Sequence, residues 1–402
     1  MQASRSVTRL AAAVSLAFGL FAQAPVANAQ AMRPEVGRPL QAAQEALKAK
    51  RFADAAAKVR EADAASGKTA NEQVTIERMR AAVAAASGDL AGQVAVINGG
   101  KLPANEQLRM VQSVAGQYYT QRDYANAATW TQRYLKEGGN DPQMRAILSQ
   151  SYYLAGDCTS LARLTGSADE SGRAPAEEQL QTLASCYQKA KDNGGYVSAL
   201  ERLATFYPKK EYWADLLNRV QTTRGFSDRL QLDVYRLKLA SGLMNGTSDY
   251  MEMAQMALGD EYPAEAKKIV DQGYSSKVLG TGNDVERQKR LADLAAKRFA
   301  EGQAALAKEE ATAVAARDGN DLVTLGYNYV GYGQGAKGIS LMEQGIKKGG
   351  LRRPEDAKLH LGIAYLQSGQ KAKALQVFKT VGGTDGTADL ARLWALQARR
   401  SA

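Results

Sequence analysis

The sequence contains few of the residues that most enzymes and metalloproteins use for their chemistry. Its 402 residues include 1 His and 2 Cys. A zinc cage needs about four ligands, and a histidine-based catalytic triad would have to use His360 alone. Glycine, proline and charged residues are at ordinary levels, with 37 Gly, 9 Pro and 23% charged residues, which excludes collagen-like, disordered and disulfide-rich classes. We therefore expect no metal, no cofactor and no catalytic residues, in a protein that is not an enzyme.

The first 29 residues are organised like a cleavable secretory signal. Arg5 and Arg9 form a basic start, residues 10–21 are almost entirely apolar, and Ala27 and Ala29 supply the small residues of a cleavage site. An apolar stretch of about 12 residues is too short for an anchor, because a membrane-spanning helix needs about 20. We expect cleavage after Ala29 and export to the periplasm as a soluble protein without a transmembrane span.

Basic residues are concentrated towards the C-terminal end. The formal net charge is +10, and residues 323–402 hold 12 Lys and Arg against 5 Asp and Glu. For an exported protein we expect no nucleic-acid partner, so this excess could attract an acidic protein, an anionic glycan or lipid headgroups. A solvated end of the fold is an equally good explanation.

A pattern of small and aromatic residues recurs about every 35 residues along the chain. In its clearest copy, Gly362 is followed by Tyr365, and from Gly326 to Gly362 is 36 residues. The positions that carry the pattern are Ala115, Tyr118, Tyr152, Gly326, Tyr329, Gly362, Tyr365, Ala374 and Phe378. Weaker copies place a small or apolar residue in the same slot at Ala43, Ala81, Leu217, Ala254 and Leu291.

This pattern resembles the tetratricopeptide repeat (TPR), in which Leu-Gly-x-x-Tyr is followed by Ala-x-x-x-Phe. The resemblance implies an all-α fold, an α-α superhelix of about nine to ten helical hairpins. In each hairpin, the small residue of the first helix lets an aromatic ring lie across it. We expect that ring to be the tyrosine three residues further on, as Tyr365 is to Gly362.

The repeat register also divides the chain. We expect repeats over 40–279 and over 321–402. Residues 280–320 have helical spacing but few anchors, and we expect an irregular pair of long helices there. Residues 30–39 should form a short disordered lead.

The two cysteines fall on neighbouring helices in this register. Cys158 stands at the start of the second helix of one repeat, and Cys186 stands on the first helix of the next. In an oxidising compartment such a pair predicts a disulfide, which would close a loop of 28 residues. Two buried free thiols are the alternative, since sequence does not give geometry.

The resemblance further implies a groove lined by the first helices. By this resemblance, the lining residues are those directly after the small slot and directly after the packing aromatic. Here they are neutral, amide-bearing and aromatic. The expected lining residues are Tyr119, Gln150, Tyr153, Asn218, Gln255 and Tyr327. Such a surface suits the backbone of an extended segment, which predicts a scaffold or adaptor for an envelope protein or peptide. The alternative is a cell-wall glycan-binding accessory factor of peptidoglycan or polysaccharide metabolism, which the rings and the basic end would favour.

Overall fold

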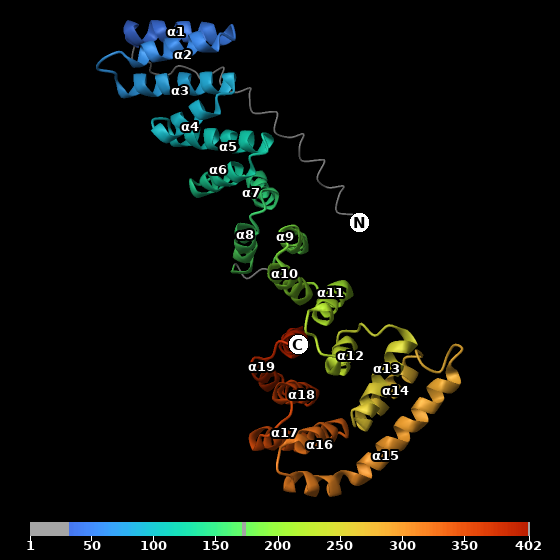
Figure 1. The fold of residues 1–402 in the computed structure, drawn as a ribbon. Helices are drawn as coiled ribbons and strands as arrows, with labels where there is room; N and C mark the ends of the chain where they lie inside the picture. The colour runs from blue at the N-terminus through green and yellow to red at the C-terminus, as the bar shows by residue number, and fades with distance from the viewer. Residues whose placement is uncertain (1–31, 171–173, 401–402) are drawn as a thin grey trace. The chain divides into compact units, whose positions relative to one another are not determined.

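The computed structural model describes residues 32–170 and 174–400, and these residues form 20 α-helices and one 3-10 helix without a strand (Figure 1). The all-α solenoid prediction is confirmed. The signal sequence over 1–29 and its cleavage site lie outside the described residues. No helix in the described part is long and apolar enough to span a membrane.

The chain divides into two compact units that share α9 (Glu177–Lys189). In described residues, the N-terminal unit comprises 32–170 with 185–192, and the C-terminal unit comprises 174–184 with 193–400. This division differs from the segment boundaries that the sequence suggested at 280 and 320. The expected disordered lead over 30–39 is also wrong from Pro34 onwards, because the first helix begins there and buries Val36.

The helices of the N-terminal unit before α9 are α1 (Pro34–Lys48), α2 (Phe52–Asp63), α3 (Ala70–Ser87), α4 (Leu90–Gly99), α5 (Ala104–Thr120), α6 (Tyr124–Lys136), α7 (Pro142–Ala155) and α8 (Cys158–Glu170). Those of the C-terminal unit after α9 are α10 (Asn193–Phe206), α11 (Lys210–Thr222), η3 (Asp228–Leu230), α12 (Gln231–Ala240), α13 (Gly246–Gly259), α14 (Pro263–Ser275), α15 (Val285–Ala315), α16 (Asn320–Gly331), α17 (Gly335–Lys348), α18 (Pro354–Gln367), α19 (Lys371–Phe378) and α20 (Thr387–Arg400).

Most helical hairpins turn at the same place in the repeat. Seven residues after the small slot, the backbone takes a left-handed conformation that ends the first helix and reverses the chain. The positive φ values at these positions are Lys50 57°, Gly88 72°, Arg122 64°, Gly156 74°, Lys191 57°, Glu261 65°, Gly333 82° and Gly369 74°. Glycine takes this conformation freely, whereas each residue with a Cβ is strained there by about 1 kcal/mol.

In the N-terminal unit the residue after the turn often caps the second helix. The Asp89 carboxylate accepts a hydrogen bond from the Gly92 N–H at 2.8 Å, and the Asp123 carboxylate accepts one from the Asn126 N–H at 3.2 Å. Such caps satisfy backbone donors that have no partner within the helix. The turn and the cap are thus both local properties of the sequence.

The small slots are real, but a different residue fills them from the one we expected. A Cβ on Gly362 would collide with the ring of Phe378, and one on Gly326 would lie 2.6 Å from Met342 Cγ. The filler therefore comes from the second helix of the same hairpin. The tyrosine three residues later is buried and turns its hydroxyl towards a glutamate on the helix before the hairpin: Tyr365 donates to Glu343, and Tyr329 donates to Glu310.

The other packing residues are buried to different degrees. Ala115, Tyr152 and Ala374 are buried, while Tyr118 is half-buried with its ring stacked on Trp130 at a centroid distance of 6.5 Å. These positions therefore contribute to the helix–helix core, as the pattern indicates.

The segment expected as an irregular pair of helices is instead one helix, α15, of 31 residues (Figure 1). Arg298 occupies the position seven residues after the Leu291 slot, and it stays helical. Between Val285 and Ala315 there is no proline, and the single glycine, Gly302, lies in the helix interior, so no residue there favours a turn. The second half of α15 contributes Leu306 and Ala313 to a core with α16 and α17.

The C-terminal unit is also held by contacts between distant parts of its sequence. The helices α18 and α20 both pack against α12 (Figure 1). The N–H of Ser227 donates to the carbonyl of Asp385 at 3.0 Å, and the Gln397 side chain donates to the carbonyl of Ala240 at 2.7 Å. These contacts tie the end of the chain to the loop before α12 and to the end of α12 itself.

Candidate functional site

Three of the expected lining residues lie on first helices of the N-terminal unit. Tyr119 on α5 is half-buried, and its ring meets the ring of Tyr124 edge-on at 5.7 Å. Burial raises the pKa of the Tyr119 hydroxyl, which therefore acts as a neutral donor or acceptor. Gln150 and Tyr153 lie about one turn apart on α7, and both are half-buried.

Tyr153 joins α7 to the last part of α9. Its hydroxyl lies 3.2 Å from Ser185 Oγ, and Lys189 Nζ stands 4.1 Å from the centre of its ring. Burial raises the pKa of Tyr153, but hydrogen bonds from Lys189 and Ser185 and the charge of Lys189 lower it further than burial raises it. Lys189 and Ser185 were not singled out in the sequence, because their role depends on how α7 and α9 pack.

The disulfide prediction is confirmed beside this contact. Cys158 and Cys186 are bonded, with their Cα atoms 5.7 Å apart, and they join the start of α8 to α9. Cys186 is the residue after Ser185, so the covalent bond fixes the part of α9 that faces Tyr153. The polar contact therefore stands on a rigid pair of helices.

The remaining expected lining residues are in the C-terminal unit, and they differ in how exposed they are. Asn218 on α11 and Gln255 on α13 are exposed. Tyr327 on α16 is 3% exposed, which corrects its assignment to an open surface. Its ring packs edge-on against Tyr262 at 5.1 Å and lies 5.5 Å from the ring of His360. Tyr327 is interior because α12 and α18 cover the side of α16 that the repeat pattern leaves open.

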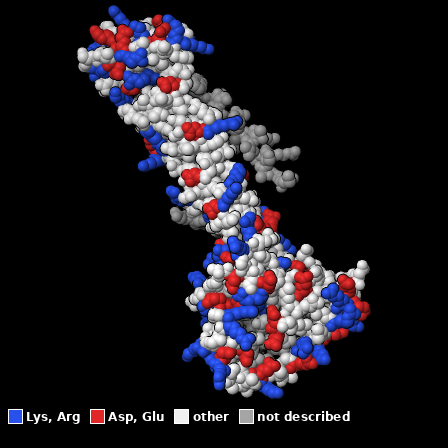
Figure 2. Space-filling model, viewed as in Figure 1, with Lys and Arg blue, Asp and Glu red and all other residues white. Residues whose placement is uncertain are grey.

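Gln255 lines a shallow depression of about 310 Å³ between α13 and α15, which we call the α13–α15 cleft. Its lining residues are Gln255, Leu258, Arg287, Arg290, Leu291 and Leu294. No carboxylate belongs to this lining. Figure 2 shows Lys and Arg side chains gathered at the beginning of α15.

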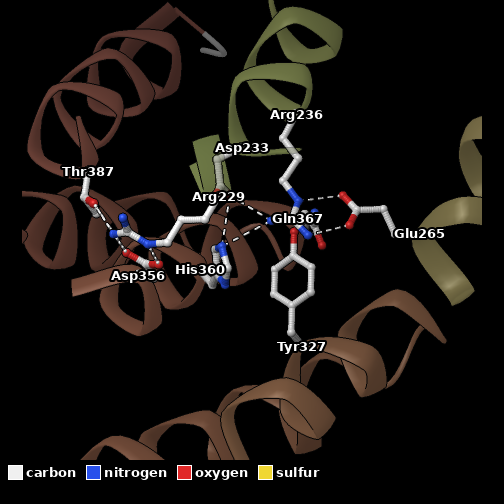
Figure 3. Close-up of polar contacts among 9 residues, drawn as sticks. All are labelled: Arg229, Asp233, Arg236, Glu265, Tyr327, Asp356, His360, Gln367 and Thr387. Carbon is white, nitrogen blue, oxygen red and sulfur yellow. Dashed lines mark hydrogen bonds and ion pairs between the residues drawn. The ribbon is translucent and has the colours of Figure 1, made fainter. Parts of the chain in front are cut away.

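A buried cluster of charged residues lies beside Tyr327 (Figure 3). Arg236 Nη1 is 2.7 Å from Asp233 Oδ1 on the same helix, and Arg236 Nη2 is 2.6 Å from Glu265 Oε2 on α14. His360 Nε2 on α18 is 2.9 Å from Asp233 Oδ1 and 3.1 Å from Arg236 Nη1. The side chains of Asp233 and Arg236 are only 5% and 3% exposed, so their charges depend on one another for stabilisation.

The electrostatics of this cluster favour the charged forms. Burial alone would raise the pKa of Asp233, but His360 and Arg236 hold it well below its usual value. Burial would likewise lower the pKa of Arg236, but Glu265, Tyr327 and Asp233 raise it well above its usual value. Asp233 pairs with Arg236 within α12 and contacts His360 on α18, and Arg236 also pairs with Glu265 on α14, so the cluster is a clasp between α12, α14 and α18.

A second ion-pair group fastens the start of the same region. Arg229 Nη2 lies 2.8 Å from Asp356 Oδ1 and 2.6 Å from Asp385 Oδ2. Burial raises the pKa of Asp385, but hydrogen bonds from Thr387 and Arg229 outweigh it and lower the pKa to about 2. We name the two groups together the α12 clasp; its residues are Arg229, Asp233, Arg236, Glu265, Asp356, His360 and Asp385.

Only weak signals for the clasp are present in the sequence. Asp233 and Arg236 are three residues apart within the otherwise apolar run Leu232–Leu237, a spacing that suits an ion pair on one helix face. Their partners lie up to 127 residues away, and no periodic pattern points to them. Within residues 32–170 and 174–400, no group of His, Cys, Asp and Glu is placed to hold a metal ion.

No family model matches the chain, and no curated protein sequence is similar to it. Several solved structures match most of the chain at low similarity. The crystal structure of yeast Tom70 is 13% identical with a TM-score of 0.22, covering 90% of this chain and 95% of that one. The TPR domain of P58(IPK) is 12% identical with a TM-score of 0.20, covering 90% and 98%. Naa15/Naa10 bound to HypK-THB is 12% identical with a TM-score of 0.21, covering 88% and 70%. With scores this low, the helical-repeat assignment rests on the helix pairs described above.

Proposed function

We propose that this protein is a non-enzymatic periplasmic scaffold that binds an extended segment of an envelope protein. Helical hairpins make up most of the described chain, and stacked hairpins of this kind present long surfaces built from successive first helices. The signal-like first 29 residues and the disulfide support an oxidising compartment outside the cytoplasm.

The observation that carries the proposal is the polar surface of α7. Gln150 offers an amide that can both donate and accept hydrogen bonds, as a peptide backbone requires. Tyr153 stands about one turn further on, held by Ser185 and Lys189 and supported by the disulfide. A preorganised surface loses little entropy on binding, so it can hold an extended segment with few contacts.

Photo-crosslinking in cells tests this proposal. A photoreactive amino acid replaces Gln150, and another replaces Thr129, an exposed residue on the second helix α6, as the matched control. We expect a discrete envelope protein to be trapped from position 150 and not from position 129, with mass spectrometry identifying it.

Three results would count against the proposal. Equal capture from both positions would show that α7 has no special role. Capture of cell-wall fragments alone from position 150 would favour the glycan-binding alternative. Hydrolase activity in the pure protein, lost on changing one carboxylate without loss of the fold, would remove the non-enzymatic part.

A further inference from the structure

The α13–α15 cleft combines exposed positive charge with exposed apolar surface. Arg287 and Arg290 are exposed on the first turns of α15, and Leu294 on the same helix is 43% exposed. Leu258 from α13 is half-buried, and Leu291 is buried beneath the cleft. Leu294 is among the few large apolar side chains that the described residues expose, so its position next to two arginines is informative.

The arginines of the cleft differ from the other basic residues of α15. Lys297 and Arg298 pair with Glu301 at 3.9 and 3.5 Å. The described residues provide no ion pair for Arg287 or Arg290, and Arg287 stands in the first turn of the helix. Positive charge is disfavoured there, because the helix dipole already makes that end positive. An anionic partner would relieve this repulsion.

The start of α15 is also held in place. Gln288 is 2% exposed; its side-chain oxygen accepts a hydrogen bond from the Gly280 N–H at 2.6 Å, and its amide donates to the Thr281 carbonyl at 3.2 Å. Arg287 directly precedes Gln288 and Arg290 follows it by two residues, so both project from a fixed helix start. Arginine guanidinium groups can bind carboxylates through two parallel hydrogen bonds.

We propose that the α13–α15 cleft binds an acidic amphipathic segment of a protein partner. An apolar side chain of that segment lies between Leu258 and Leu294, and its carboxylates reach Arg287 and Arg290. The amide of Gln255 hydrogen-bonds the segment's backbone. This inference rests on the proposed scaffold function, but it assigns a second surface, in the other unit, and a chemical class to its occupant.

A peptide-binding measurement on the full mature chain tests the assignment. The probe is a fluorescein-labelled 14-residue peptide of Glu and Leu with leucines at helical spacing, and its counterpart carries Gln for every Glu. Fluorescence anisotropy gives the dissociation constants. We expect the Glu peptide to bind at least about tenfold more tightly than the Gln peptide, with affinity falling as salt is raised.

Matched charge reversals locate the binding. R287E/R290E should weaken binding of the Glu peptide by about tenfold or more. K297E/R298E makes the same charge change on the same helix outside the cleft and should change it by less than about twofold. Leu294→Ala should weaken both peptides equally, because both use the apolar contact. Circular dichroism and thermal melts of each variant confirm that the fold is retained.

Either of two results overturns the assignment. One is equal loss of affinity in both charge-reversed variants, which would mean attraction by overall charge rather than by the cleft. The other is no binding of the Glu peptide to the unchanged protein. The crosslinking at position 150 is read independently, so a failure of the cleft and a failure of the scaffold function remain distinguishable.

Discussion

The two units are held together in different ways. In the N-terminal unit, the side-chain hydrogen bond that joins Arg33 to Glu72 spans 39 positions of the sequence. In the C-terminal unit, Arg229 bonds to Thr387, 158 positions away. The first pattern belongs to a linear array in which each hairpin touches its neighbours, and the second to a structure whose end packs on its beginning. The difference teaches that one repeat pattern can give both an array and a closed unit, depending on long-range polar contacts.

The largest change in stability is expected when Arg236, at the centre of the α12 clasp, is replaced. Arg236→Met leaves the buried Asp233 and the half-buried Glu265 without their cation, which costs about 3 to 5 kcal/mol in the free energy of unfolding. We expect α12, α14 and α18 to lose protection together in hydrogen exchange, while α1 to α6 keep theirs. Arg133→Met is the control, because Arg133 pairs with Glu137 at the surface and its loss costs at most about 1 kcal/mol. A similar small loss for both variants would contradict the clasp.

The next largest effect belongs to the N-terminal unit. Replacing Cys158 and Cys186 by Ala opens a loop of 28 residues, which costs about 3 to 4 kcal/mol on the chain-entropy model. Denaturant unfolding of that unit should shift, and exchange protection should fall in α8 and in the last turns of α9. Equal destabilisation of α16 to α18 would show that the units unfold as one, against the comparison.

Lowering the pH should reduce the stability of each unit through a different carboxylate. The pKa of Asp385 is lowered to about 2 in the folded protein, against about 3.9 in an unfolded chain. Its contribution is therefore present above about pH 3.9 and is lost as the pH falls towards 2. Glu72 in the N-terminal unit also has its pKa lowered to about 2, mainly by the hydrogen bond from Arg33.

Two variants measure these contributions. D385N should reduce the loss of stability at low pH in the C-terminal unit only. E72Q should reduce the loss of stability at low pH in the N-terminal unit only. The stability of each unit is followed by hydrogen exchange from pH 5 downwards. A reduced loss of stability in both units from one substitution would mean that these carboxylates do not act locally.

A smaller effect is expected at the helix caps. Asp123→Ala removes the acceptor for the Asn126 N–H at the start of α6, and such a change costs about 1 kcal/mol. Thermal unfolding of the N-terminal unit measures it. Asp123→Ser, which keeps an acceptor, should recover most of the loss, and no recovery would mean that the carboxylate acts in another way.

The smallest effects have opposite signs at equivalent repeat positions. Arg122 has φ +64° at a turn, so Arg122→Gly should stabilise by about 0.5 to 1 kcal/mol. Arg298 holds the same position relative to its slot but lies inside α15, so Arg298→Gly should destabilise by a similar amount. Melting temperatures of the two variants decide this. The same sign for both would contradict the view that α15 lacks a turn at this position.

These positions also show what the sequence could and could not predict. The helical fold, the small slots at Gly326 and Gly362 and the disulfide follow from local spacing, and each is confirmed by the structure. The continuity of α15 was missed because absent turn residues are harder to recognise than present ones. Tyr327 was misplaced because its burial depends on α12, more than 80 residues earlier in the chain.

The residues of the α13–α15 cleft were likewise only partly predictable from the sequence. Gln255 was identified by its position in the repeat, and it does line the cleft. Arg287 and Arg290 were not identified, because in the sequence they are two of several charges on a helix. Only the packing of α13 on α15 places them beside an exposed leucine.

A helix without a turn has a mechanical consequence for the C-terminal unit. With 31 residues at about 1.5 Å each, α15 is a rod about 46 Å long. Its first turns carry the cleft, and Leu306 and Ala313 near its other end belong to the core with α16 and α17. In a hairpin, a load on one helix can be absorbed at the reversal of the chain. In α15 the helix is continuous, so a force applied by a partner bound at the cleft is transmitted along the helix to that distant core.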